Sequence, residues 1–189
     1  MAKNSPVLLQ RTQSSKLKSL ALSFPVVSLI GPRQSGKTTL ARSVFPEHTY
    51  VSLEDLDNRH YAETDPRGFL AQYNKNVIID EVQRVPDLFS YMQTKVDELD
   101  LPGQYILTGS ANLTLLEKVT QSLAGRAALL KLLPLSFAEL FSNGAAVLDC
   151  TEQLFTGFYP RIYRHHIEPT DLYPNYIQTY LEKDVRELI

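Results

Sequence analysis

The segment from Gly31 to Thr38 has the residue types and spacing of a phosphate-binding loop. It matches the pattern G-x-x-x-x-G-K-[ST], known as Walker A, at every fixed position. Such a loop turns backbone N–H groups onto a phosphate, and the next helix adds the positive end of its dipole. We expect Lys37 to hold the β- and γ-phosphates of a nucleotide and Thr38 to place its hydroxyl on Mg²⁺. The residues expected to contact the nucleotide are Gly31, Pro32, Arg33, Gln34, Ser35, Gly36, Lys37, Thr38 and Thr39.

A pair of carboxylates ends the apolar run NVIIDE, residues 76–81, which predicts a buried strand. We expect Asp80 to join Thr38 in the magnesium shell, as the Walker B residue, and Glu81 to orient and deprotonate the attacking water. Nucleotide kinases and GTPases generally do not need a glutamate at this position, whereas hydrolytic ATPases do. The pair therefore favours hydrolysis over transfer to a small acceptor.

Other polar residues allow two interpretations each. Ser110 and Asn112 come at the end of a predicted strand and either sense the γ-phosphate, or cap the next helix, with Asn112 as its N-cap. Arg126 is either an arginine finger supplied to a neighbouring copy or a surface arginine, and the sequence alone favours the surface residue. Arg33 either contacts the nucleotide or faces solvent or a partner.

The elements that must position these residues alternate along the chain. Apolar runs predict strands at 25–31, 49–55, 76–81, 104–110 and 127–135, and periodic runs predict helices at 14–24, 38–45, within 56–75, and at 85–99, 113–125 and 172–189. This alternation indicates an α/β fold, a mainly parallel sheet with helices on both faces. We expect an ATPase domain over 1–141, a linker over 142–153 and the incomplete start of a helical C-terminal domain over 154–189.

Composition narrows the class of protein. The 189 residues are 43% hydrophobic and 21% charged, as in ordinary globular domains. A net charge of −2 gives no support for a nucleic-acid partner. Cys150 is the only cysteine, which suits a reducing cytoplasm, and the apolar run at 127–135 is too short to span a bilayer. We therefore expect a cytoplasmic protein with no membrane partner.

The phosphate-binding loop, the Asp80-Glu81 pair, the strand end with Ser110 and Asn112, and Arg126 follow one another along the chain. This set of motifs resembles that of the AAA+ superfamily of P-loop ATPases. More narrowly, the phrases GPRQSGKTTLA, IIDEVQRVPDLF, ILTGSANL and SLAGRAALLKLLPLSFAEL resemble uncharacterised bacterial and archaeal ATP-binding proteins that pair an AAA domain with a C-terminal domain of unknown function. The resemblance implies the three-layer α/β/α P-loop fold with strand order 5-1-4-3-2, and ATP with Mg²⁺. It also implies Glu81 as the catalytic base, Ser110 or Asn112 as the sensor, and self-association that lets Arg126 act in trans.

Three functions remain open from the sequence. The first is an ATPase whose cycle moves or regulates the C-terminal module, and the second is a nucleotide-dependent switch with negligible turnover. The third is a DNA-associated motor, because Asp80-Glu81-Val82-Gln83 resembles a helicase DExQ box. The presence of a single phosphate-binding loop counts against the third.

Overall fold

The computed structural model of the protein describes residues 9–110, 121–145 and 149–181, and the chain forms two compact units. The sheet unit consists of Thr12–Pro32 and Gly36–Leu132. The helical unit consists of Met1–Arg11, Arg33–Ser35 and Leu133–Ile189. The apex of the predicted phosphate-binding loop therefore groups with the helical unit, although the two ends of the loop belong to the sheet unit.

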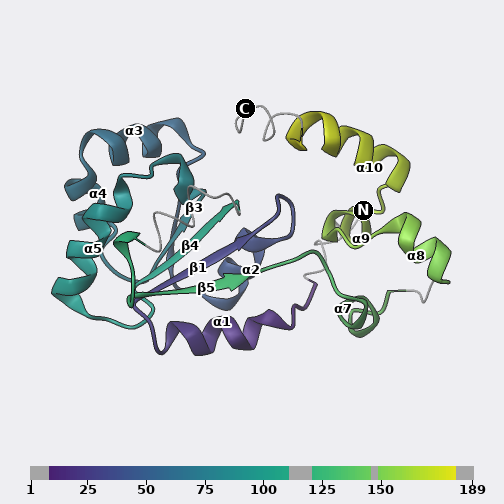
Figure 1. Ribbon diagram of the computed structural model, residues 1–189, viewed down its shortest axis with the longest axis horizontal. Helices are drawn as coiled ribbons and strands as arrows, with labels where there is room; N and C mark the ends of the chain where they lie inside the picture. Colours follow the sequence, from purple (N-terminus) through teal and green to yellow (C-terminus); the bar gives the residue numbers. More distant parts are fainter. Residues whose placement is uncertain (1–8, 111–120, 146–148, 182–189) are drawn as a thin grey trace, which may run out of the picture. The chain divides into compact units, whose positions relative to one another are not determined.

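The described residues of the sheet unit form a five-stranded parallel sheet with the order β2-β3-β4-β1-β5 (Figure 1). This confirms the predicted fold class and the order 5-1-4-3-2. The continuous apolar runs indicated strands buried on both faces, as parallel sheets require. The strands are β1 (Val26–Gly31), β2 (Thr49–Ser52), β3 (Val77–Asp80), β4 (Tyr105–Ser110) and β5 (Ala127–Lys131).

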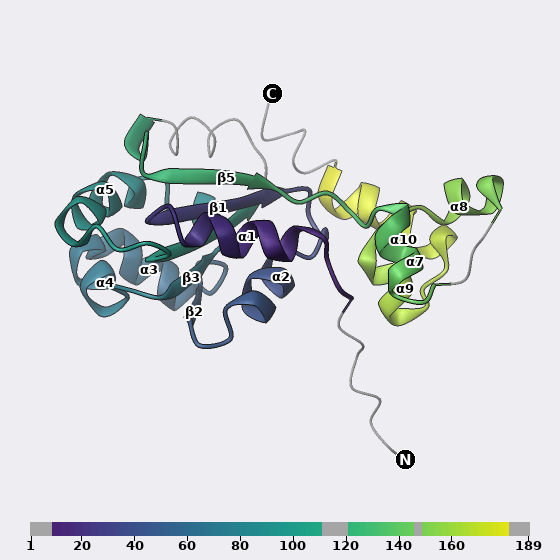
Figure 2. The same ribbon diagram turned by 90° about the horizontal axis from the view of Figure 1, so that it is seen from below.

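Alternate residues of the central strands β1, β3 and β4 enter two separate cores. Val27, Ile78 and Ile106 pack with Leu17 of α1 and Leu40 of α2 on one face of the sheet. The residues between them in the strands pack with α3, α4 and α5 on the other face. Figure 2 shows α1 running beside β1. These helices are α1 (Gln13–Ala21), α2 (Lys37–Val44), α3 (Leu56–Thr64), α4 (Pro66–Gln72) and α5 (Leu88–Leu99).

Element boundaries differ from the predicted ones for local reasons. The range predicted as helical within 56–75 holds two helices, because Asp65 ends α3 and its carboxylate accepts a hydrogen bond from the N–H of Gly68 in α4. The helix predicted from residue 85 begins at Leu88, because Val82–Arg84 forms the short 3₁₀ turn η1 and Pro86 comes after it. Most of the helix predicted at 113–125 lies outside the described residues.

Short helices make up the described part of the helical unit. They are α7 (Phe137–Ser142), α8 (Cys150–Thr156), α9 (Pro160–His165), α10 (Pro169–Tyr176) and the π-helical turn η2 (Ile177–Leu181). Ile162, Leu172 and Tyr176 are buried, whereas Ile177, in the helix predicted at 172–189, is half exposed. The rings of Tyr159, Tyr173, Tyr176 and Tyr180 form a chain of aromatic contacts. The last predicted helix is thus confirmed to residue 181, and its remaining residues lie outside the described part.

Candidate functional site

The predicted loop joins the carboxyl end of β1 to the first turn of α2. Gly31 is the last residue of β1 and Lys37 the first of α2. Gly36 has a φ of 93° and Gln34 a φ of 61°, both in the left-handed region. Alternation of left-handed and ordinary backbone is what makes successive N–H groups converge in an anion-binding nest. The backbone conformation therefore favours glycine at position 36, in agreement with the motif.

Lys37 is held inside this loop. Its side chain is buried, and its Nζ donates hydrogen bonds to the carbonyl oxygens of Gly31 at 3.0 Å and Pro32 at 2.9 Å. A buried ammonium needs such acceptors, because desolvation without them is costly. The loop therefore places a positive charge where a phosphate oxygen could replace a carbonyl oxygen as its partner.

The Asp80 carboxylate is the centre of a hydroxyl network. Its Oδ1 accepts hydrogen bonds from Thr38 Oγ1 at 2.7 Å and from Thr108 Oγ1, and its Oδ2 accepts one from Tyr50 Oη at 3.0 Å. Asp80 itself is buried. The structure thus brings together Thr38 and Asp80, the two residues that the sequence predicts as magnesium ligands.

Tyr50 and Thr108 were not among the predicted site residues. Tyr50 lies opposite Ile78 in the register of β2 and β3, and Thr108 lies two residues after Ile106 in β4. Strand residues two apart share a face, so both side chains point to the face that carries Asp80 and α2. Burial, and then the negative charge of Asp80, raise the pKa of Tyr50, so its hydroxyl keeps the proton that it donates. The strand parity in the sequence was a signal that could have found them.

Glu81 adopts a left-handed backbone, with φ 56° and ψ 42°. A residue other than glycine pays about 1–3 kcal/mol for such a conformation, and such strain concentrates at functional sites. Its Oε2 accepts a hydrogen bond from Gln83 Nε2 at 2.5 Å. The strained turn therefore directs the second carboxylate into contact with the side-chain amide of Gln83, which was not among the predicted site residues either.

Ser110 lies beside the loop, because it pairs with Gly31 in the register of β4 and β1. Its Oγ is buried and has no hydrogen-bond partner among the described residues. This position is compatible with the predicted sensor. Asn112, the other sensor candidate and the predicted N-cap, lies outside the described residues.

Arg126 is separated from all of these groups. It directly precedes β5, and its carbonyl accepts a hydrogen bond from the N–H of Val26, the first residue of β1. Val26 and Gly31 are at opposite ends of that strand, roughly 16 Å apart at ~3.3 Å per residue. The exposed guanidinium pairs with both carboxylate oxygens of Asp97 in α5, and these hydrogen bonds lower the pKa of Asp97.

Arg33 and Thr39 were also predicted to contact the nucleotide. The guanidinium of Arg33 lies 5.3 Å from the ring centroid of Tyr180, within the helical unit. Thr39 is exposed on α2. Both remain predictions as nucleotide contacts.

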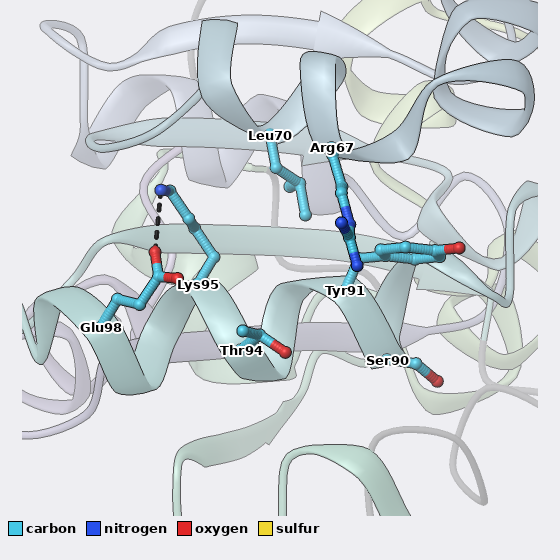
Figure 3. Close-up of a pocket in the computed structure, with 7 residues that line it drawn as sticks. All are labelled: Arg67, Leu70, Ser90, Tyr91, Thr94, Lys95 and Glu98. Atoms are coloured by element: carbon cyan, nitrogen blue, oxygen red, sulfur yellow. Dashed lines mark hydrogen bonds and ion pairs between the residues drawn. The ribbon is translucent and has the colours of Figure 1, made fainter.

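A pocket on the other face of the sheet unit contains none of the predicted site residues (Figure 3). Its walls are α4 and α5, with Arg67 over the ring of Tyr91 and Lys95 paired with Glu98 at 3.0 Å.

Within the described residues, no cluster of three or more histidine, cysteine or acidic side chains could hold a metal ion. In the same part of the chain, no helix combines the length and apolar character that crossing a bilayer requires.

Comparison with known proteins identifies the family. Residues 23–141 match the family model described as AAA domain. The chain belongs to this AAA family. It is also 35% identical over 182 residues to an uncharacterized protein of Mycobacterium bovis and, equally, to one of Mycobacterium tuberculosis. These alignments cover 95% of this chain, which spans about 40% of the length of either relative.

Solved structures show the same fold at low sequence identity. The Walker-type ATPase PABY2304 of Pyrococcus abyssi matches 98% of this chain and 78% of its own, with a TM-score of 0.62 and 15% identity. DnaA of Aquifex aeolicus in its AMPPCP-bound form matches 90% of this chain and 63% of its own, with a TM-score of 0.51 and 17% identity. The shared fold, together with the AAA family match over residues 23–141, makes the sheet unit a P-loop domain of the AAA type.

Proposed function

We propose that the AAA domain of this chain binds ATP with Mg²⁺ and hydrolyses it. The observation that carries the proposal is the 2.7 Å hydrogen bond between the Thr38 hydroxyl and the Asp80 carboxylate. These two groups belong to different elements and have the chemistry that a P-loop site needs around magnesium. Family membership and the resemblance to a Walker-type ATPase support ATP as the ligand.

The residues present fit Mg²⁺–ATP. Thr38 and Asp80 offer oxygen ligands, which magnesium prefers, and Lys37 offers an ammonium within the loop. Ser110 adds a buried hydroxyl at the same edge of the sheet. When bound, Mg²⁺–ATP would supply a phosphoryl group whose negative charge the ion partly neutralises.

Each side chain then has a defined task. Lys37 exchanges its loop carbonyls for phosphate oxygens and stabilises negative charge there. Glu81 accepts a proton from the attacking water, and Gln83 orients its carboxylate. Tyr50 and Thr108 hold Asp80 so that its Oδ1 faces Thr38.

One observation favours the alternative of a nucleotide-dependent switch with negligible turnover. The Glu81 carboxylate is already engaged by Gln83 at 2.5 Å. If this contact persists with nucleotide bound, the base is held back from water, and nucleotide binding alone provides the signal.

Purified protein with two variants tests the proposal. The parent should hydrolyse ATP in a Mg²⁺-dependent reaction, measured as phosphate release. Glu81→Gln should keep its affinity for ATP and lose about 10²–10⁴-fold in kcat, the usual contribution of a general base. Lys37→Ala should lose ATP binding itself. Parent protein that binds ATP tightly without releasing phosphate would support the switch, and a Glu81→Gln protein as active as the parent would remove Glu81 as the base.

A further inference from the structure

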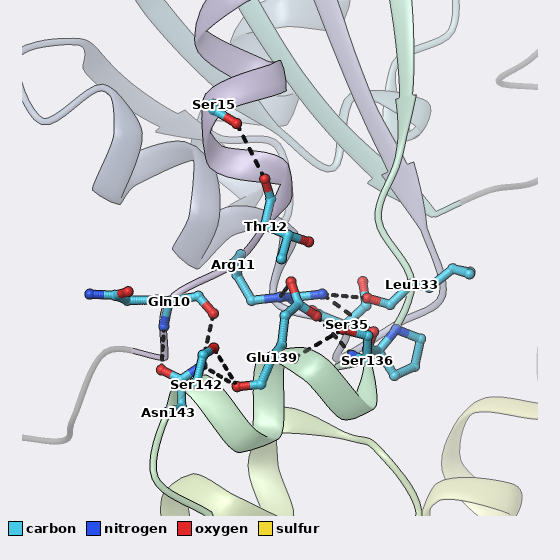
Figure 4. A network of polar contacts seen from close by, with 11 residues as sticks. Gln10, Arg11, Thr12, Ser15, Ser35, Leu133, Ser136, Glu139, Ser142 and Asn143 are labelled. Atoms are coloured by element: carbon cyan, nitrogen blue, oxygen red, sulfur yellow. Dashed lines mark hydrogen bonds and ion pairs between the residues drawn. The ribbon is translucent and has the colours of Figure 1, made fainter.

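A buried ion pair lies in the helical unit beside the apex of the phosphate-binding loop. The Nε of Arg11 is 3.1 Å from Oε1 of Glu139, and the two side chains are only 7% and 4% exposed. Arg11 stands just before α1, and Glu139 is in the first turn of α7. Figure 4 shows the two side chains side by side. The proposed ATPase mechanism uses neither residue.

The other nitrogens of Arg11 bind backbone carbonyl groups. Nη1 donates a hydrogen bond to the carbonyl oxygen of Ser35 at 2.7 Å, and Nη2 donates one to that of Leu133 at 2.6 Å (Figure 4). A guanidinium is a rigid planar fork, so its orientation toward one partner fixes its orientation toward the others. Arg11 therefore ties the loop apex to α7 and to the segment that precedes it.

The contact with Ser35 bears directly on the phosphate cradle. A peptide group is planar and trans, so the carbonyl oxygen of Ser35 and the N–H of Gly36 point in opposite directions. Holding the carbonyl outward onto Arg11 holds the N–H of Gly36 on the opposite side. A hydrogen bond to the carbonyl from a charged donor also polarises the peptide and strengthens the N–H as a donor.

Glu139 in turn fixes Arg11. Its Oε2 accepts a hydrogen bond from the N–H of Ser136 at 2.8 Å, and the Ser136 hydroxyl accepts one from the N–H of Glu139 at 3.1 Å. This reciprocal arrangement is the capping box of α7, which restrains the carboxylate. The carboxylate also balances the buried charge of Arg11.

We propose that Arg11, oriented by Glu139, is a positioning residue for the phosphate-binding loop. This role rests on the proposed nucleotide function. In this role, Arg11 and helix α7 support the loop. In the alternative, purely structural role, the ion pair of Arg11 and Glu139 would only anchor the segment before α1 on α7.

Asn143 gives a matched control for that alternative. Its side chain anchors the same segment to the same helix, because Oδ1 accepts from the N–H of Gln10 at 2.7 Å and Nδ2 donates to the Gln10 carbonyl oxygen at 2.9 Å. Neither contact involves the loop. Asn143→Ala therefore loosens the segment without removing the bond to Ser35.

The test compares Arg11→Lys, Arg11→Gln and Asn143→Ala in two measurements. Lysine keeps the positive charge, but its single ammonium cannot span Glu139 and Ser35 together. Both Arg11 variants should weaken ATP binding about tenfold in calorimetry, as expected from losing one charged hydrogen bond to the loop. Asn143→Ala should bind ATP within about twofold of the parent.

Hydrogen exchange of the nucleotide-free protein separates this inference from the proposed function. Amides of residues 33–37 should exchange faster in Arg11→Lys than in the parent, and at the parent rate in Asn143→Ala. Unchanged loop exchange in Arg11→Lys, or an equal rise in Asn143→Ala, would overturn the positioning role whether or not ATP binds. A parent that fails to bind ATP while the exchange pattern holds would overturn the proposed function alone.

Discussion

At the scale of single residues, the chemistry of the site depends on how Asp80 is held. Hydroxyls of Thr38, Tyr50 and Thr108, from a helix and two neighbouring strands, meet on its carboxylate. Partners of this kind fix the orientation of a metal ligand before the metal arrives. Each of them is therefore expected to matter for magnesium affinity, including those that would not touch the ion.

Tyr50→Phe tests this expectation. The change removes the hydroxyl that donates to Asp80 Oδ2 at 3.0 Å and leaves the ring in place. Because outer partners of a ligand typically contribute 10–100-fold to metal affinity or activity, half-maximal ATP turnover should need about tenfold more Mg²⁺. Tyr91→Phe is a matched control, since Tyr91 is 39% exposed and Tyr50 is 38%. The positioning role is wrong if both variants keep the Mg²⁺ requirement of the parent.

The sequence predicted those site residues that a local pattern marks. Lys37, Thr38, Asp80 and Glu81 stand in contiguous motifs at strand ends, and the structure places each beside the loop or at the end of β3. Arg11 could not be found in this way. Its role depends on contacts with residues 24 and 128 positions away, which no local periodicity encodes.

At the scale of elements, the central strands β1, β3 and β4 were predictable because parallel strands buried on both faces give uninterrupted apolar runs. Their ends were less predictable. The predicted strand 49–55 stops at Ser52, where its partner β3 ends at Asp80, so pairing rather than composition sets the boundary. The ends also carry the site, because the carboxyl ends of neighbouring parallel strands meet at one edge of the sheet.

The central strand β4 gives a prediction on stability. Tyr105 is fully buried there, and burial raises its pKa from 10.0 to about 12. The native state thus keeps a proton that the unfolded chain loses, so stability should be intact below pH 10 and fall as the pH rises toward 12. Two pKa units correspond to about 2.7 kcal/mol.

Urea unfolding between pH 8 and 11.5 measures the first part of that loss. Tyr105→Phe lacks the titrating group, so its free energy of unfolding should fall less over the same range. Equal alkaline slopes in parent and variant would show that Tyr105 does not titrate differently in the two states.

At the scale of the whole molecule, the AAA match covers part of this chain, and the chain covers part of its curated relatives. The chain spans about 40% of the length of its curated relatives, and the match to the AAA family covers residues 23–141. The predicted linker at residues 142–153 stays a prediction, as does the role of the C-terminal module. Coupling of the proposed ATPase cycle to the residues C-terminal to the AAA domain, and to neighbouring copies, likewise stays a prediction.

Arg126 allows the self-association to be tested. It lies at the end of the sheet opposite its own loop, so any action on ATP must be on a neighbouring copy. If it acts as a finger, specific activity should rise with protein concentration, and Arg126→Ala should lose about 10³-fold in kcat. A mixture of inactive Lys37→Ala and Arg126→Ala proteins should recover activity, because the first supplies the arginine and the second an intact loop.

Asp97→Ala is the control for this experiment. It breaks the same exposed pair but leaves the guanidinium in the protein, so it should keep the activity that Arg126→Ala loses. If the two variants lose activity equally, the pair stabilises the junction of α5 and β5, and Arg126 is a surface residue. Constant specific activity over the concentration range, together with no recovery on mixing, would also show that Arg126 is not an arginine finger.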